Sequence, residues 1–223
     1  MSLQAIETAH SDGAADMLFT LAAAEGSAAH RFVKSQELLN GRNATRNLAD
    51  AVHYLCVLHG RHPGVIDHAA TKSFHPAAAG WLIQAAEAFA AERAFLTKLV
   101  VAAGPVPSTP GQAESEAAVL QQQHALDMLA QSDRAGCALG AAFALALDWR
   151  EIRAVLDEAA MKLGLDVEPL MLPDDEETRT VAAEVAETSA IERAMIFGAQ
   201  QILTQHRGLW DLLEARQMAR AAL

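Results

Sequence analysis

Apolar side chains recur every three to four residues along almost the whole chain, which is the spacing typical of amphipathic α-helices. Glycine and proline interrupt this period at intervals, and no segment shows the alternating pattern of a β-strand. Gly26 and Gly208 are further candidate breaks within long helical stretches. The sequence predicts helices over the ranges 14–39, 47–59, 65–72, 76–103, 110–131, 132–147, 149–163 and 174–219.

The residues at the ends of these stretches support an all-helical reading. His75-Pro76 opens a long helix, because proline fits the first helical position. Thr109-Pro110-Gly111-Gln112 has the pattern of a capping box. The prediction is an all-α protein with one domain over residues 1–223, folded as a multi-helix bundle of seven to nine helices. Ferritin-like and haem-oxygenase-like bundles are the nearest analogies, and they are analogies of architecture rather than of function.

A nine-residue segment recurs one hundred residues downstream. Residues 86–94 (AEAFAAERA) and 186–194 (AETSAIERA) agree at six of nine positions, including two glutamates and one arginine. Matches between alanines carry little weight in so alanine-rich a chain. One interpretation is an internal duplication, with units 14–103 and 113–206 related by a pseudo-twofold axis. The other is coincidence among alanine-rich helices.

Composition narrows the class of protein. The chain has 223 residues, of which 52% are hydrophobic and 5% aromatic, and its formal net charge is −11. An acidic chain without a basic run argues against binding to nucleic acid or to an anionic membrane surface. The longest apolar run, residues 138–147, is too short to span a bilayer. Two cysteines far apart, Cys56 and Cys137, make no disulfide framework, so we expect a reduced, cytoplasmic protein.

Two glutamates are candidates for chemistry. Glu92 and Glu192 each lie on an apolar stripe of a predicted helix, where a carboxylate is costly to bury without a partner. One interpretation places them face to face inside the bundle as metal ligands, as in di-iron bundle proteins, although the Glu-x-x-His motif of that plan is absent. The other interpretation is structural: Glu92 pairs with Arg193 and Glu192 with Arg93 across a pseudo-twofold axis, or the two carboxylates cap buried donors.

Histidines supply further candidates. His53 shares a helix face with Cys56 at a spacing of three residues, and His124 follows a run of glutamines on another helix. Imidazole and thiolate are sound ligands for zinc and iron, but no known metal-binding spacing is matched. The candidate metal ligands are therefore Glu92, Glu192, His53 and His124. We expect no cofactor, with a bound metal ion as the alternative.

Motifs of several common enzyme classes are absent from the sequence. It contains no phosphate-binding loop, dinucleotide fingerprint, Gly-x-Ser-x-Gly elbow, His-Glu-x-x-His or Cys-x-x-Cys. Residues 59–68 (HGRHPGVIDH), 104–112 and 136–149 together resemble an uncharacterised family of all-helical alphaproteobacterial, sphingomonad-like proteins. The resemblance implies a soluble helical protein, and it carries no assigned function and no catalytic residues.

Two functions from different classes remain open at this point. The first is a non-enzymatic helical protein that binds a small ligand or a partner, with a homodimer as one form of that association. The second is a helical-bundle oxidoreductase that depends on a metal or another cofactor. The first predicts that the buried glutamates are satisfied by arginines or backbone groups. The second predicts a polar pocket that gathers the four candidate ligands.

Overall fold

The computed structural model describes residues 3–73 and 75–222, with side chains from Gly13 onward. Over these residues the chain is helical and contains no strand, so the predicted all-α bundle of seven to nine helices is confirmed. The elements are α1 (Leu3–Glu25), the 3-10 turn η1 (Ser27–Ala29), α2 (Gln36–Leu39), α3 (Ala44–His59), α4 (Val65–Lys72), α5 (Pro76–Ala103), α6 (Gln112–Ala130), α7 (Cys137–Leu163), α8 (Asp175–Val185) and α9 (Ser189–Ala221).

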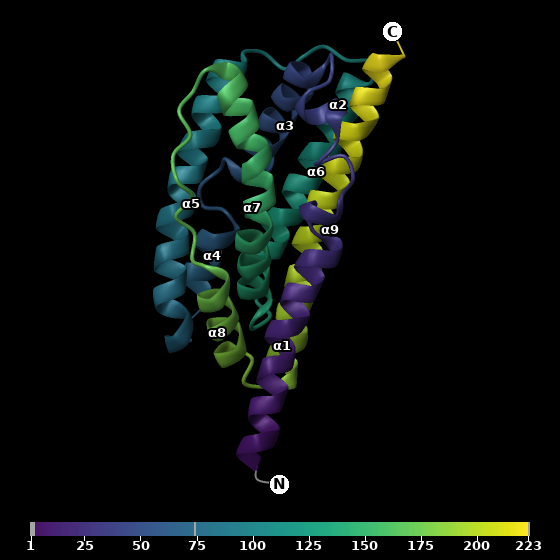
Figure 1. Ribbon diagram of the computed structural model, residues 1–223. Helices are drawn as coiled ribbons and strands as arrows, with labels where there is room; N and C mark the ends of the chain where they lie inside the picture. The colour runs from purple at the N-terminus through teal and green to yellow at the C-terminus, as the bar shows by residue number, and fades with distance from the viewer. Residues whose placement is uncertain (1–2, 74, 223) are drawn as a thin grey trace.

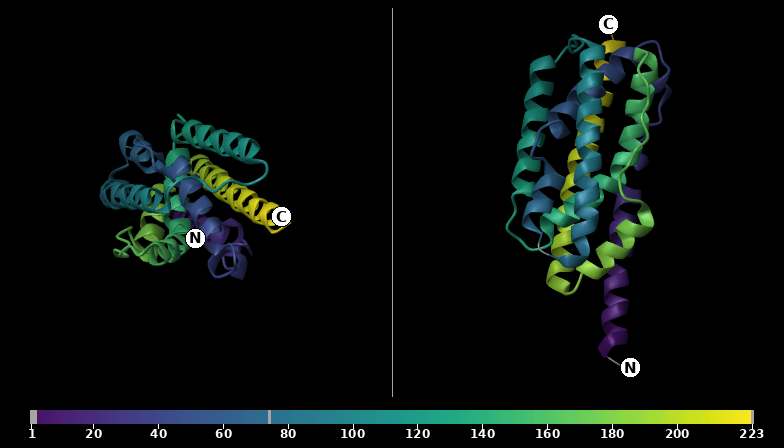
Figure 2. Two further views of the ribbon diagram at one scale, coloured as in Figure 1. Left: turned by 90° about the horizontal axis from the view of Figure 1, so that it is seen from above. Right: turned by 90° about the vertical axis from the view of Figure 1, so that its left-hand side faces the viewer.

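The long helices form an elongated bundle (Figure 1). α7 packs between α5 on one side and α9 on the other, and the two views of Figure 2 agree with this arrangement. The first turns of α1 extend beyond the other helices, at the end of the bundle where α8 and the start of α9 lie. The last turn of α9 lies at the opposite end, near the start of α3. None of the described helices combines the length and apolar character needed to cross a membrane.

α7 is the centre of the hydrophobic core. Its first half, residues 137–146, is buried on every side, and a helix that is apolar all round belongs in the interior of a bundle. Alanine and glycine make up most of this half. Small side chains let the surrounding helices approach α7 closely, which suits a chain that has few aromatic residues to fill wide gaps.

The contact between α7 and α9 depends on two glycines. A Cβ atom on Gly198 would overlap the carbonyl oxygen of Cys137, and a Cβ atom on Gly140 would overlap the backbone of Met195. In both cases the obstacle is backbone, which cannot rotate away as the end of a flexible side chain can. Glycine at these two positions therefore sets how closely the helices approach.

Most helix ends follow the sequence signals. α3 ends at His59 with Gly60 as its C-cap, and Pro76 is the first residue of α5, as expected. The side chain of Asp174 accepts a hydrogen bond from the backbone N–H of Glu177 (2.8 Å) and so caps α8.

Two predicted boundaries are wrong. The capping box expected at Thr109 does not form: α6 begins only at Gln112, and the Thr109 hydroxyl instead accepts a hydrogen bond from Arg220 (2.8 Å). The boundary expected at residues 147–149 is also absent, because α7 runs through it without interruption. Asp148 is buried there, and its carboxylate binds groups on other elements rather than a helix start.

The single helix expected over 174–219 is likewise two helices. α8 ends at Val185, and the side chain of Thr188 accepts a hydrogen bond from the backbone N–H of Ile191 (3.3 Å), which caps a new helix. No break occurs at Gly208.

The recurring segment therefore adopts two different structures. Residues 86–94 lie in the middle of α5, whereas residues 186–194 contain the break between α8 and α9 and the first turn of α9. A shared sequence has not produced a shared local structure here. The duplication of units 14–103 and 113–206 stays a prediction.

Replacing Gly198 with alanine should destabilise the fold by about 1–3 kcal/mol, the usual cost of overpacking, because the new methyl group would meet the backbone of α7. Gly80 in α5 is the matched control, since a Cβ atom there meets nothing within 4 Å. Gly80→Ala should stabilise the protein by about 0.5–1 kcal/mol. Urea unfolding of both variants and the wild type measures the difference, and equal effects would contradict the close approach of α7 and α9.

Candidate functional site

A buried carboxylate, Asp148 of α7, joins three elements of the bundle. Ser27 of η1 donates two hydrogen bonds to it, from the backbone N–H to Oδ1 (2.6 Å) and from the hydroxyl to Oδ2 (2.7 Å). Nδ1 of His206 in α9 lies 2.6 Å from Oδ2, and Trp210 Nε1 donates to the Ser27 hydroxyl (2.8 Å). Gly26 leaves room for this contact, since a Cβ atom there would lie 2.5 Å from Oδ1. The protein itself thus supplies the donors that a buried carboxylate requires.

His206 extends this network to His59, the last residue of α3. The two Nε2 atoms are 2.9 Å apart, and both rings are buried. Burial, with a smaller contribution from His206, lowers the pKa of His59 well below its ordinary value, so this imidazole is neutral at pH 7. His206 Nδ1–H donates to Oδ2 of Asp148, because a carboxylate oxygen can only accept, and the two Nε2 atoms share one hydrogen bond.

Glu92 of α5 lies in a second buried network beside the first. Trp149 Nε1 donates to its Oε2 (2.9 Å), and Arg153 Nη1 donates to its Oε1 (2.7 Å). Burial raises the pKa of Glu92, while the bonds from Trp149 and Arg153 act in the opposite direction. The rings of Trp149 and His59 meet edge to face, with centroids 5.3 Å apart, so the two networks adjoin.

The ion pairs are not those predicted from the recurring segment. Glu92 pairs with Arg153 of α7, so its expected pairing with Arg193 is wrong. Arg93 donates two hydrogen bonds to Asp67 of α4 (2.9 and 3.1 Å), which leaves its expected pairing with Glu192 without support. Glu92 and Arg93 meet different helices because neighbouring residues of a helix point about 100° apart.

The four candidate metal ligands are not gathered into one site. Glu92 is held as described above, and His53 Nε2 forms a hydrogen bond with the carbonyl oxygen of Gly104 (2.8 Å). His124 is exposed on α6, and Glu192 is half-buried in the first turn of α9. The described part of the chain contains no group of three or more His, Cys, Asp or Glu side chains placed to hold a metal ion.

The Asp148 network is closed to solvent. Asp148, His206 and His59 are 3%, 0% and 4% exposed, and none of them lines the cavities at the two ends of the bundle. Hydrolases use an aspartate–histidine pair to orient a base, but here a substrate has no approach to the imidazole. The network therefore stabilises helix packing, and a functional site has to lie elsewhere.

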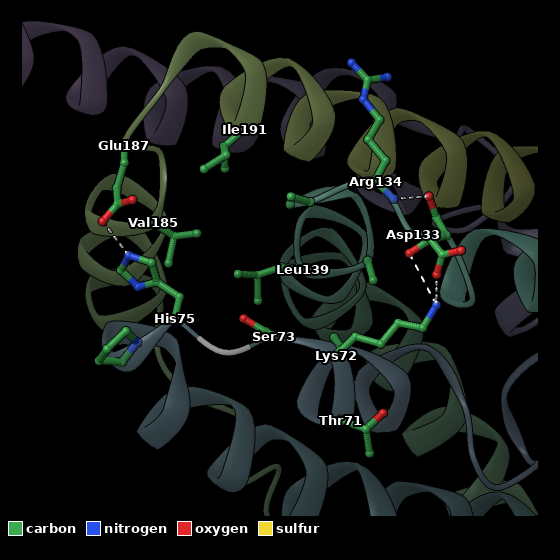
Figure 3. A pocket seen from close by; sticks show the side chains of 16 residues that line it. Thr71, Lys72, Ser73, His75, Asp133, Arg134, Leu139, Val185, Glu187 and Ile191 are labelled. Carbon is green, nitrogen blue, oxygen red and sulfur yellow. Dashed lines mark hydrogen bonds and ion pairs between the residues drawn. The ribbon is translucent and has the colours of Figure 1, made fainter.

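A cavity of about 750 Å³ lies at the end of the bundle where three chain connections meet. The connection between α4 and α5 contributes Ser73 and His75, the connection between α6 and α7 contributes Ser132 to Gly136, and the connection between α8 and α9 contributes Glu187. Figure 3 shows these segments surrounding the first turn of α7. The cavity therefore exists because helices end here and connections pack less densely than the helices.

The interior of the cavity is apolar. Leu139 lies near the middle of the view in Figure 3, with Val185 and Ile191 on the neighbouring walls. Leu139 and Val185 belong to the hydrophobic core, so the lining is continuous with it. Gly136 shapes this wall, because a Cβ atom there would lie 3.0 Å from the side chain of Ile191.

Ion pairs close two opposite sides of the cavity. Lys72 lies 3.1 Å from Asp133 on one side, and His75 Nε2 lies 3.0 Å from Glu187 on the other (Figure 3). The Lys72 ammonium also donates to the backbone carbonyl of Gln131. These charged groups are occupied by one another rather than directed at a ligand.

Two polar groups of the lining are left without a partner among the described residues. The Ser73 hydroxyl points toward the cavity in Figure 3 and forms no hydrogen bond there. His75 Nδ1 is buried and unbonded as well. Nδ1 has no exposed surface, so a ligand in the open cavity does not reach it. The cavity thus combines an apolar interior with one free hydroxyl.

Sequence reasoning did not identify this cavity. Only His75-Pro76 was recognised there, and as a helix start rather than as a lining. The remaining lining comes from connections that are distant in sequence, so no spacing or motif marks it.

The fold and the cavity together define an all-helical bundle protein with a sealed core and a ligand-sized pocket at one end. The chain belongs to a family of unknown function, DUF6975, whose model matches residues 22–221. This match confirms the expected membership of an uncharacterised family that covers most of the chain. No curated protein and no solved structure matches the chain.

The free energy of unfolding should fall as the pH drops below about 6.5, by up to about 1.4 kcal/mol per pH unit for His59. The reason is that His59 takes up a proton in the unfolded chain at its ordinary pKa, whereas the lowered pKa keeps it neutral in the folded protein. Urea unfolding between pH 5 and 8 measures the slope. His59→Gln should lose this contribution and His124→Gln should keep it, and the same slope in both variants would contradict the assignment.

Proposed function

We propose that this protein binds a small, mainly apolar molecule that carries a hydroxyl or N–H group, in the cavity between α4, α7, α8 and α9. The observation that carries the proposal is a cavity of about 750 Å³ with an apolar interior and an unpartnered Ser73 hydroxyl. Sites for small molecules in proteins have about this volume and this combination of a largely apolar lining with a few polar groups.

The free polar group of the lining bears on the chemistry of the ligand. The Ser73 hydroxyl accepts a hydrogen bond from, or donates one to, a hydroxyl or N–H group of the ligand. The two nearby acids, Asp133 and Glu187, are engaged by Lys72 and His75. The side chain of Arg134, the remaining charged residue of the lining, points away from the cavity in Figure 3, so a neutral ligand suits this site.

The same arrangement favours binding over turnover. Nucleophilic catalysis needs a hydroxyl within hydrogen-bond reach of a base, and Ser73 makes no hydrogen bond with His75. The alternative drawn from the sequence, a metal- or cofactor-dependent oxidoreductase, required Glu92, Glu192 and His53 in one pocket, and that grouping has no support among the described residues.

The charge and the cysteine content of the chain bear on its partners and on its location in the cell. A net charge of −11 supports a protein that does not bind nucleic acid, and two free cysteines support a cytoplasmic location. Association as a homodimer stays a prediction.

A pair of probes tests the proposal. 2-Naphthol has an apolar body and a hydroxyl donor, and 2-methoxynaphthalene has the same body without the donor. The wild type should bind 2-naphthol about fivefold more tightly, because one hydrogen bond contributes about 1 kcal/mol. Fluorescence titration of both compounds measures the ratio, and Ser73→Ala should reduce it while the apolar binding remains.

Ser73→Trp should fill the cavity and remove binding of both probes without lowering the melting temperature, since Ser73 is only half-buried. Gln121→Trp adds the same side chain to the exposed face of α6 and is the matched control. Unchanged binding in Ser73→Trp would place the probes elsewhere and overturn the proposal.

A further inference from the structure

A second cavity, of about 530 Å³, lies at the opposite end of the bundle. It is bounded by the connection between α2 and α3, the first turns of α3, the connection between α5 and α6, and the last turns of α9. Most of the residues that line it have polar or charged side chains, and none of them belongs to the hydrophobic core, in contrast with Leu139 and Val185 of the cavity of Figure 3. Three arginines take part, Arg42, Arg46 and Arg220, together with one carboxylate, Glu37. In a chain with an excess of acidic residues, this is a local concentration of positive charge.

A buried cluster behind the cavity carries more positive than negative charge. Arg216 donates two hydrogen bonds to Asp50 (2.9 and 3.0 Å), and Arg220 Nη1 lies 2.6 Å from the same carboxylate. Two guanidinium groups thus share one acid, and all three side chains are more than nine-tenths buried. An uncompensated buried charge is costly, and the negative end of α9 offsets only part of it.

Neutral acceptors hold Arg220 in a fixed position. Asn47 Oδ1 accepts from its Nη2 (2.6 Å), and the Thr109 hydroxyl accepts from its Nη1 (2.8 Å). Its Nε has no hydrogen-bond partner among the described residues, and the same is true of Nη1 of Arg216. Among the described residues, the cluster therefore retains two donors without a hydrogen-bond partner and one more positive than negative charge.

The mouth of the cavity adds donors of the same sign. Arg42 and Arg46 are exposed, so their guanidinium groups are free to turn toward the cavity. The 16-residue helix α3 begins here at Ala44, and its N-cap residue Asn43 makes no side-chain capping hydrogen bond. Ala44 N–H is bonded to the carbonyl oxygen of Gly41 (2.9 Å), so the N–H groups of Thr45 and Arg46 are the ones left for an anion. The positive end of a helix adds to the attraction for an anion.

We propose that this cavity binds the phosphate or carboxylate group of a small molecule, which would neutralise the excess charge of the arginine cluster. The oxyanion contacts Arg46 and Arg42 at the mouth and approaches the start of α3, with Arg220 behind it. Arginine suits this role because its planar guanidinium binds phosphate and carboxylate with two parallel hydrogen bonds. The volume exceeds that of a single oxyanion, so the rest of the molecule has space beside it.

Melting temperatures in sodium phosphate, sodium succinate and sodium chloride, all at the same ionic strength, test the proposal. The expected result is a saturable rise with phosphate or succinate that chloride does not produce, because ligand bound only by the folded state stabilises it. A rise with phosphate alone assigns phosphate esters, and a rise with succinate alone assigns carboxylates. Equal melting temperatures in all three salts would overturn the proposal.

Two arginine variants locate the effect. Arg46→Gln removes a charged donor from the cavity mouth and should raise the half-saturating phosphate or succinate concentration about tenfold. Arg61→Gln is the matched control, since Arg61 is an exposed arginine outside the lining of this cavity. Equal saturation curves for the two variants would show that the anion binds elsewhere, and this would contradict the site.

Discussion

The structure depends on how one carboxylate is buried at the middle of its central helix. Inside a protein a carboxylate needs donors to replace its lost hydration, and Asp148 receives them from Ser27 and His206. These bonds fix the position of η1 against α7 and the position of α9 along α7. His206 in turn positions His59 at the end of α3. Removing one partner from a buried charged pair costs about 3–5 kcal/mol. That is a large part of the 5–15 kcal/mol by which proteins are usually stable.

The architecture could be predicted from the sequence because it follows from local periodicity and from helix-end signals. Pro76 and Gly60 mark ends of α5 and α3 without reference to any other helix. Where the prediction failed, a distant contact decided the outcome. A helix boundary was predicted at Asp148, but Asp148 lies inside the continuous helix α7, where Ser27 and His206 bind it. Thr109 was predicted to cap a helix, but its hydroxyl binds the arginines of α9.

The candidate site could not be predicted from the sequence for the same reason. The charged partners of Glu92 and Arg93 lie 61 and 26 residues away, and no pattern of charge selects them. The recurring segment even pointed to the wrong partner for Glu92. The cavity of Figure 3 is lined by three connections that meet only after α4, α7 and α8 have packed. Its properties, an apolar interior with an unpartnered hydroxyl, arise from tertiary structure. The buried polar networks thus lie inside the bundle, whereas the two cavities proposed as binding sites lie at its ends.

The central claim is that the ligand site lies at the end of the bundle and not in the polar core. A crystal structure of the protein soaked with 2-naphthol tests this claim most directly. The account predicts the naphthyl ring against Leu139 and Val185, with its oxygen within hydrogen-bond distance of Ser73 Oγ. Electron density for the compound beside His59 and His206, or on the outer surface with the cavity empty, would contradict it.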